Sequence, residues 1–156
     1  MIRIHRILFP TDFSENARYA QDYACALAEQ FQADLHVLYV MQDLALVMPE
    51  PGVMFAIPAL SPEEAEQTAS RALAEIVHPQ WPQAKIHRST RRGTPYVEIV
   101  RYAAEHQIDL IVLGTHGRSA VPHALLGSVA EKVVRSAGCP VLTVRKSGRQ
   151  PAVPEH

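Results

Sequence analysis

A glycine-rich segment is the part of the sequence whose residue types and spacing most clearly indicate chemistry. Gly114 and Gly117 are separated by two residues, and Gly127 and Ser128 follow after nine more. Glycines let backbone N–H groups turn toward an anion without interference from a Cβ atom. Gly127 and Ser128 also open a predicted helix, whose partial positive charge favours a phosphate. We therefore predict a phosphate site; the alternative is that these residues only form a turn and a cap, with Ser128 capping its own helix.

The polar residues inside this segment do not form a recognisable catalytic arrangement. Thr115, His116, Arg118 and His123 lie within it. No nucleophile and base stand at a familiar spacing, so we interpret both histidines as polar loop residues rather than catalytic groups. Arg118 either neutralises phosphate charge or is solvated. The sequence also lacks the patterns G-x4-G-K-[ST] and G-x-G-x-x-G of other nucleotide sites. We expect a protein that holds a nucleotide, not an enzyme that cleaves one efficiently.

The elements that must position this segment alternate between strands and helices. Apolar runs predict strands at 4–10, 34–40, 85–90, 109–113 and 140–145. Helices are expected after Ser14, after Ser61, from Thr94 to about His106, and over about 128–137. The third helix is expected to turn four residues inward: Val97, Val100, Ala103 and Ala104. Nearly continuous apolar strands alternating with helices indicate an α/β fold, with a parallel sheet covered on both faces.

Together with the glycine pattern, two further motifs resemble the universal stress protein family. They are Pro10-Thr11-Asp12 after the first predicted strand and Gly138-Cys139-Pro140 before the last one. The resemblance extends from about Ile4 to Arg145, and the pattern G-x2-G-x9-G-S is typical of the family's ATP-binding branch. It implies an open five-stranded parallel sheet of order 3-2-1-4-5 and a homodimer. It also implies ATP bound at the strand ends, with Mg²⁺ or Mn²⁺.

The resemblance assigns roles to individual residues. It implies that the three glycines and Ser128 hold the phosphates, that Asp12 accepts hydrogen bonds from the ribose, and that Val40 meets adenine through its backbone. The complete expected set is Pro10, Thr11, Asp12, Val40, Gly114, Thr115, His116, Gly117, Arg118, Gly127, Ser128 and Val129. In the implied strand order, Asp12 and Gly114 should face one crevice. Asp12 has an alternative role in an Asx-turn or a helix cap, for which Ser14 competes.

Length and composition limit the class of protein. The chain has 156 residues and a mass of 17.3 kDa, 47% of its residues are hydrophobic, and its formal net charge is −1. We expect a single domain over residues 1–146 with a flexible tail at 147–156, and the charge argues against a general nucleic-acid binder. No apolar stretch approaches about 18 residues, so no membrane span is expected. The start of the chain has no signal-peptide pattern, so we expect a cytoplasmic protein.

The two edge strands of the predicted sheet and one long connector are expected to have distinct roles at the surface. The basic residues His87, Arg88, Arg91 and Arg92 suit an edge strand, where charge blocks unwanted pairing, better than they suit nucleic acid. The last strand, Val141 to Val144, joins subunits in the resembling family, so we expect a homodimer there. The connector 41–60 is either a nucleotide-ordered lid or an apolar flap.

The function expected from these features is that of an ATP-dependent regulator or sensor in the stress response, acting on an unknown protein partner. A slow ATPase or phosphotransferase that uses the same site is one alternative. A dimeric interaction module that does not use nucleotide is the other.

Overall fold

The computed structural model of the chain is an α/β fold and describes residues 2–42, 61–76, 85–116 and 126–145. Its strands are β1 (Arg6–Thr11), β2 (Asp34–Met41), β3 (Ile86–Arg92), β4 (Leu110–Gly114) and β5 (Val141–Val144). Its helices are α1 (Glu15–Phe31), α2 (Pro62–Ala74), α3 (Pro95–Glu105) and α4 (Ser128–Ser136). The expectations for the connector from 43 onward, for Gly117, Arg118 and His123, and for the tail lie outside the described residues.

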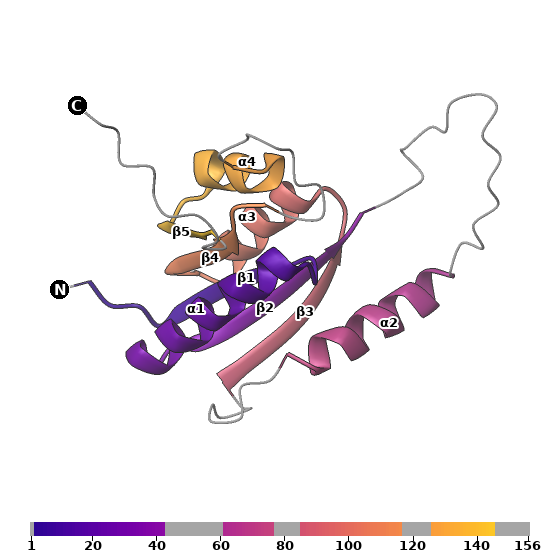
Figure 1. The fold of residues 1–156 in the computed structure, drawn as a ribbon, viewed down its shortest axis with the longest axis horizontal. Helices are drawn as coiled ribbons and strands as arrows, with labels where there is room; N and C mark the ends of the chain where they lie inside the picture. Colours follow the sequence, from indigo (N-terminus) through magenta and orange to yellow (C-terminus); the bar gives the residue numbers. More distant parts are fainter. Residues whose placement is uncertain (1, 43–60, 77–84, 117–125, 146–156) are drawn as a thin grey trace.

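The five strands form one parallel sheet of order β3-β2-β1-β4-β5, which confirms the predicted topology (Figure 1). β1 lies at the centre, where Ile7 pairs with Leu35 of β2 on one side and with Leu110 of β4 on the other. Strand β1 is buried on both faces, as its unbroken apolar run requires. β3 and β5 are the two edge strands, so the basic cluster lies on an edge as predicted.

Helices cover both faces of the sheet (Figure 1). On one face, α1 packs over β1 and β4 through small residues such as Ala17, Ala20, Ala24 and Ala28, and α2 packs beside it against β3. On the other face, α3 and α4 pack together against a second apolar cluster that includes Leu8 and Ile111. None of the helices in the described ranges is long and apolar enough to span a bilayer.

The helix starts follow the sequence signals with one exception. The Ser14 Oγ accepts a hydrogen bond from the Ala17 N–H over 3.2 Å, and Ser61 forms a reciprocal capping box with Glu64. Thr94 occupies the N-cap position of α3, but its side chain makes no capping hydrogen bond. Pro95 at the first helical position fixes the start of α3 through its own backbone geometry.

The predicted inner face of α3 is wrong in part. The helix buries Glu98, Ile99, Tyr102 and Ala103, whereas Ala104 is exposed. The prediction favoured aliphatic residues over a tyrosine. The Tyr102 ring is nevertheless buried, because its hydroxyl finds two polar partners there: His36 Nδ1 at 3.0 Å and Ser89 Oγ at 3.2 Å.

Candidate functional site

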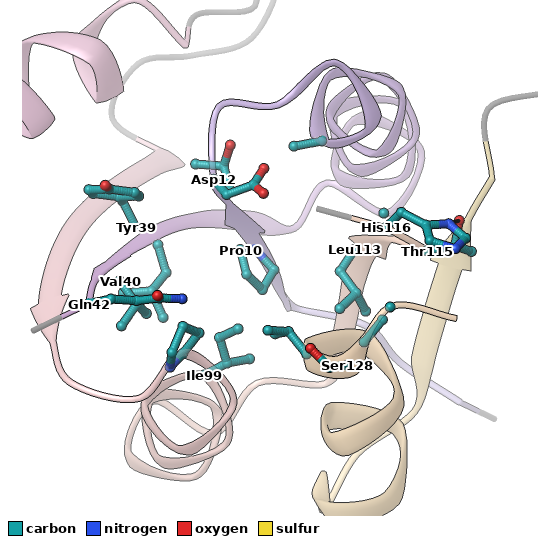
Figure 2. A pocket seen from close by; sticks show the side chains of 18 residues that line it. Pro10, Asp12, Tyr39, Val40, Gln42, Ile99, Leu113, Thr115, His116 and Ser128 are labelled. Carbon is teal, nitrogen blue, oxygen red and sulfur yellow. Dashed lines mark hydrogen bonds between the residues drawn. The ribbon is translucent and has the colours of Figure 1, made fainter. Parts of the chain in front are cut away.

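A cavity of about 520 Å³ opens at the carboxyl ends of β1, β2 and β4, between these strands and the first turns of α3 and α4. This is where the strand order reverses, the place at which open α/β sheets bind ligands. The residues that line it are Pro10, Thr11, Asp12, Ala17, Leu38, Tyr39, Val40, Gln42, Pro95, Ile99, Leu113, Gly114, Thr115, His116, Gly127, Ser128, Val129 and Ala130. Figure 2 shows two ends of the cavity: Tyr39, Val40 and Gln42 at one, and Thr115, His116 and Ser128 at the other.

The cavity brings together ten of the twelve residues expected to bind a nucleotide. They come from four separate segments of the chain, at 10–12, 40, 114–116 and 127–129. Gly117 and Arg118 lie outside the described residues, so the structure does not place them. Asp12 and Gly114 line the same cavity, as their positions after neighbouring strands predict.

Asp12 lies in a tight turn between β1 and α1. Its Oδ1 accepts a hydrogen bond from the Ser14 N–H over 3.0 Å, and the Thr11 Oγ1 accepts one from the Phe13 N–H over 3.0 Å. The Asx-turn considered as an alternative role for Asp12 is therefore present, while the helix cap belongs to Ser14. A carboxylate oxygen has more than one lone pair, so this turn leaves Asp12 able to accept hydrogen bonds from a ligand in the cavity.

Gly114 has a packing reason to lack a side chain. A Cβ atom at this position would lie 3.0 Å from the Asn16 carbonyl oxygen and 3.2 Å from its carbonyl carbon. The end of β4 thus passes directly against the first turn of α1, and only glycine allows this approach without displacement. Gly114 therefore packs against the helix that follows the turn carrying Asp12.

The first turn of α4 supplies the backbone donors of the cavity. Gly127 is the N-cap residue, so Ser128 is the first helical residue and does not cap its own helix. The Gly127 N–H already donates to the Thr115 carbonyl over 2.6 Å, and the first intrahelical bond runs from the Glu131 N–H to the Gly127 carbonyl over 2.9 Å. Helix geometry leaves the N–H groups of Ser128, Val129 and Ala130 without intrahelical acceptors, at the positive end of the helix dipole.

Thr115 and His116 lie beside this helix start. The Thr115 Oγ1 and the His116 Nδ1 are 3.1 Å apart, and the tautomer of the imidazole decides which group donates. Thr115 is buried, and its N–H donates to the Val144 carbonyl over 2.9 Å. Its backbone therefore connects β4, β5 and the start of α4.

Apart from Val40, sequence reasoning missed the residues at the apolar end of the cavity. Leu38, Tyr39 and Gln42 come from β2 and the residues just after it, Pro95 and Ile99 come from α3, and Leu113 comes from β4. The strand register contains the signal that would have found the first two, because Leu38 pairs with Pro10 and Tyr39 with Thr11. Ile99 could have been found only if the inner face of α3 had been predicted correctly.

A buried histidine on β2 packs against α3. His36 on β2 is 7% exposed; its ring stacks on the His87 ring with centroids 4.7 Å apart and meets the His106 ring edge-on at 5.6 Å. Burial, followed by the positive charges that His87 and His106 can carry, lowers the pKa of His36 to about 4. A neutral His36 thus supports the packing of α3, whose first turns line the cavity.

Comparison with known proteins identifies the family of this fold and site. The model of the Universal stress protein family matches residues 3–145. The chain belongs to the universal stress protein family. It is 36% identical over 148 residues to Universal stress protein MJ0531 of Methanocaldococcus jannaschii, a match that covers 93% of this chain and 84% of that protein.

Solved structures of universal stress proteins share the fold. The hypothetical protein MJ0577 of Methanocaldococcus jannaschii superposes with a TM-score of 0.74 at 25% identity, covering 95% of this chain and 100% of that chain. A universal stress protein solved in complex with cAMP superposes with a TM-score of 0.65 at 22% identity, covering 92% of this chain and 98% of the other. At that identity the second comparison shows the common fold alone.

Proposed function

We propose that this universal stress protein binds ATP in the cavity at the strand ends and acts as a nucleotide-dependent regulator. The observation that carries the proposal is the meeting of Asp12, Val40 and the start of α4 around one space of about 520 Å³. A universal stress protein of this fold has been solved in complex with cAMP, and we propose an adenine nucleotide as the ligand class by analogy with it.

Each part of a nucleotide has a chemically suited partner in the cavity. The phosphates would accept hydrogen bonds from the N–H groups of Ser128, Val129 and Ala130, as anions do at helix N-termini. The ribose hydroxyls would donate to the Asp12 carboxylate. The base would lie at the apolar end and meet the Val40 backbone, since flat apolar surfaces exclude water from a purine.

A divalent cation fits this cavity as a companion of the nucleotide. Asp12 is the one carboxylate among the residues that line the described cavity, which is too few for a dedicated cation cage. Mg²⁺ or Mn²⁺ would therefore be bound chiefly through the phosphate oxygens, whose charge it would neutralise. The Thr115 and Ser128 hydroxyls lie at that end of the cavity and are compatible with metal-bound water.

We propose binding without efficient turnover, and assembly through β5. Regulation would follow from the effect of occupancy on the surface offered to a protein partner. Strand β5 is an edge strand, and Leu142 on it is 37% exposed, so a second copy of the chain could pair with it as a homodimer. A slow ATPase remains the rival function, because Thr115 and His116 lie together at the phosphate end.

Calorimetric titration with ATP and Mg²⁺ tests the proposal, together with mass spectrometry of what the purified protein releases on denaturation. Asp12→Ala should weaken binding by about tenfold or more, because a charged hydrogen-bond acceptor is lost. Asp22→Ala on the exposed side of α1 is the matched control and should bind as the wild type does. Absence of both released nucleotide and binding heat would refute the proposal. Steady phosphate release that disappears in Asp12→Ala would favour the ATPase.

A further inference from the structure

Phe13 adopts a backbone conformation that is unusual for a large side chain. Its φ is 61°, in the left-handed region, where a Cβ atom clashes with the following carbonyl group. In the described part of the chain, two other non-glycine residues have a positive φ: Gln32 at 55° and Gln107 at 50°. Both follow helix ends, where a left-handed residue is common. Phe13 instead follows the end of a strand, next to Asp12 in the cavity.

Packing holds Phe13 in this conformation. Its ring centroid lies 4.8 Å from that of Tyr39, with the planes tilted by 45°, and the ring packs against the core under α1. The backbone adds the hydrogen bond from the Phe13 N–H to the Thr11 Oγ1. Asparagine or glycine would adopt the left-handed conformation at lower cost, so the presence of phenylalanine indicates that the ring itself has a role.

Phe13 lies in the chain between Asp12 and Ser14, which are joined by a hydrogen bond. The Asp12 Oδ1 accepts from the Ser14 N–H two residues later, and the Ser14 Oγ in turn caps α1. The left-handed backbone of Phe13 therefore sets the position of the Ser14 N–H relative to the Asp12 carboxylate. Strain of this kind persists where the surrounding structure over-determines it, which is characteristic of functional sites.

We propose that Phe13 is a positioning residue, whose ring, anchored on Tyr39, holds the turn that fixes the Asp12 carboxylate at the ribose position of the cavity. This inference rests on the proposed nucleotide site. Phe13 contacts no ligand in this account and acts through Asp12. It should therefore affect the recognition of the ribose hydroxyls more than the binding of phosphate or base.

The test compares ATP with 2′,3′-dideoxy-ATP, which lacks the hydroxyls that Asp12 would recognise. The wild-type protein should bind ATP about tenfold more tightly than the dideoxy analogue. Phe13→Asn tolerates the left-handed backbone but removes the ring, and should reduce this ratio to near one while leaving the affinity for the dideoxy analogue unchanged. Phe13→Tyr keeps the ring and should restore the ratio. An equal loss of both affinities in Phe13→Asn would show a purely structural role and overturn the inference.

A second measurement needs no nucleotide. Hydrogen exchange at the Ser14 amide, followed by NMR in the ligand-free protein, reports the bond to Asp12 directly. Exchange should accelerate in Phe13→Asn and stay at the wild-type rate in Phe13→Tyr, while amides in the middle of β1 stay protected in both and so show that the variants are folded. If the wild type fails to bind ATP, the proposed function fails, and this measurement still decides whether Phe13 holds Asp12. Unchanged Ser14 exchange in Phe13→Asn would refute the inference.

Discussion

The Gly127 amide nitrogen lies 2.6 Å from the Thr115 carbonyl oxygen, so the start of α4 is bonded to the residue that follows β4. Thr115 also donates its own N–H to the Val144 carbonyl at the end of β5. The donors of the first turn of α4 are therefore oriented before any ligand arrives. Preorganisation of this kind reduces the entropy lost on binding.

Gly114→Ala should destabilise the protein because the new methyl group would meet the Asn16 carbonyl at 3.0 Å. We expect a loss of about 1–3 kcal/mol in the free energy of unfolding, the usual cost of overpacking, measured by urea denaturation. Gly138→Ala is the matched control, since no atom lies within 4 Å of its added Cβ. Equal losses in the two variants would contradict the packing role of Gly114.

Acid should weaken the fold through His36. The pKa of His36 is lowered to about 4 from an unfolded value of 6.5, so the unfolded chain takes up the proton first as the pH falls. The free energy of unfolding is therefore unaffected by protonation of His36 above pH 6.5. It decreases progressively as the pH falls toward 4, by up to about 3 kcal/mol. The nearby charged groups are Arg6, Asp34, His87 and His106.

Urea denaturation at several pH values measures this effect. His36→Gln removes the titration and should flatten the decline in the free energy of unfolding over that pH range. His5→Gln, on the exposed N-terminal segment, should leave the decline as it is in the wild type. A decline that is equally steep in His36→Gln would assign the acid sensitivity to other groups.

Arg88 should hold α2 against the sheet. Its Nε donates to the Leu73 carbonyl over 3.0 Å and its Nη2 to the Ile76 carbonyl over 2.8 Å, which satisfies carbonyls at the end of α2. Arg88→Ala should accelerate hydrogen exchange in α2 and cost about 1–3 kcal/mol of stability. Arg92→Ala removes one longer bond, of 3.4 Å to the Pro62 carbonyl, and should have the smaller effect. The reverse order would argue against this role.

Leu142→Lys tests the proposed assembly through β5. A charge on an exposed edge strand opposes strand pairing, so the variant should shift the chain from dimer to monomer in sedimentation equilibrium. Tyr23→Lys introduces the same charge at an exposed position on α1 and should leave the dimer intact. A wild-type chain that is monomeric at all concentrations would exclude the β5 homodimer.

The parallel sheet and most of the cavity could be predicted from the sequence, because buried parallel strands have unbroken apolar runs and ligands bind at their carboxyl ends. The family resemblance supplied the order, and the structure confirms it. The inner face of α3 could not be predicted reliably, since the burial of Tyr102 depends on His36 and Ser89, which approach it only in the folded chain.

Other features of the site depend on tertiary contacts of the same kind. The sequence pattern correctly indicated a special position at Gly114, but the reason for it, the carbonyl of Asn16, belongs to a helix nearly a hundred residues away in the chain. The helix begins at Ser128, as expected, and Gly127 occupies the N-cap position, so Ser128 does not cap its own helix. Tyr39 lines the cavity beside Thr11, with which it pairs across β1 and β2, and this pairing exists only in the folded sheet.

The interleaved order of the strands makes the molecule suitable for division into two interlocking pieces. A cut between Ile76 and Lys85 would place β1 and β2 in one fragment and β3, β4 and β5 in the other, yet β2 pairs with β3 and β1 with β4. The central pair of strands would then fit between the two arms of the second fragment. Asp12 and Val40 would belong to one fragment and Gly114 and Ser128 to the other. A ligand in the cavity would therefore contact both fragments and stabilise their association.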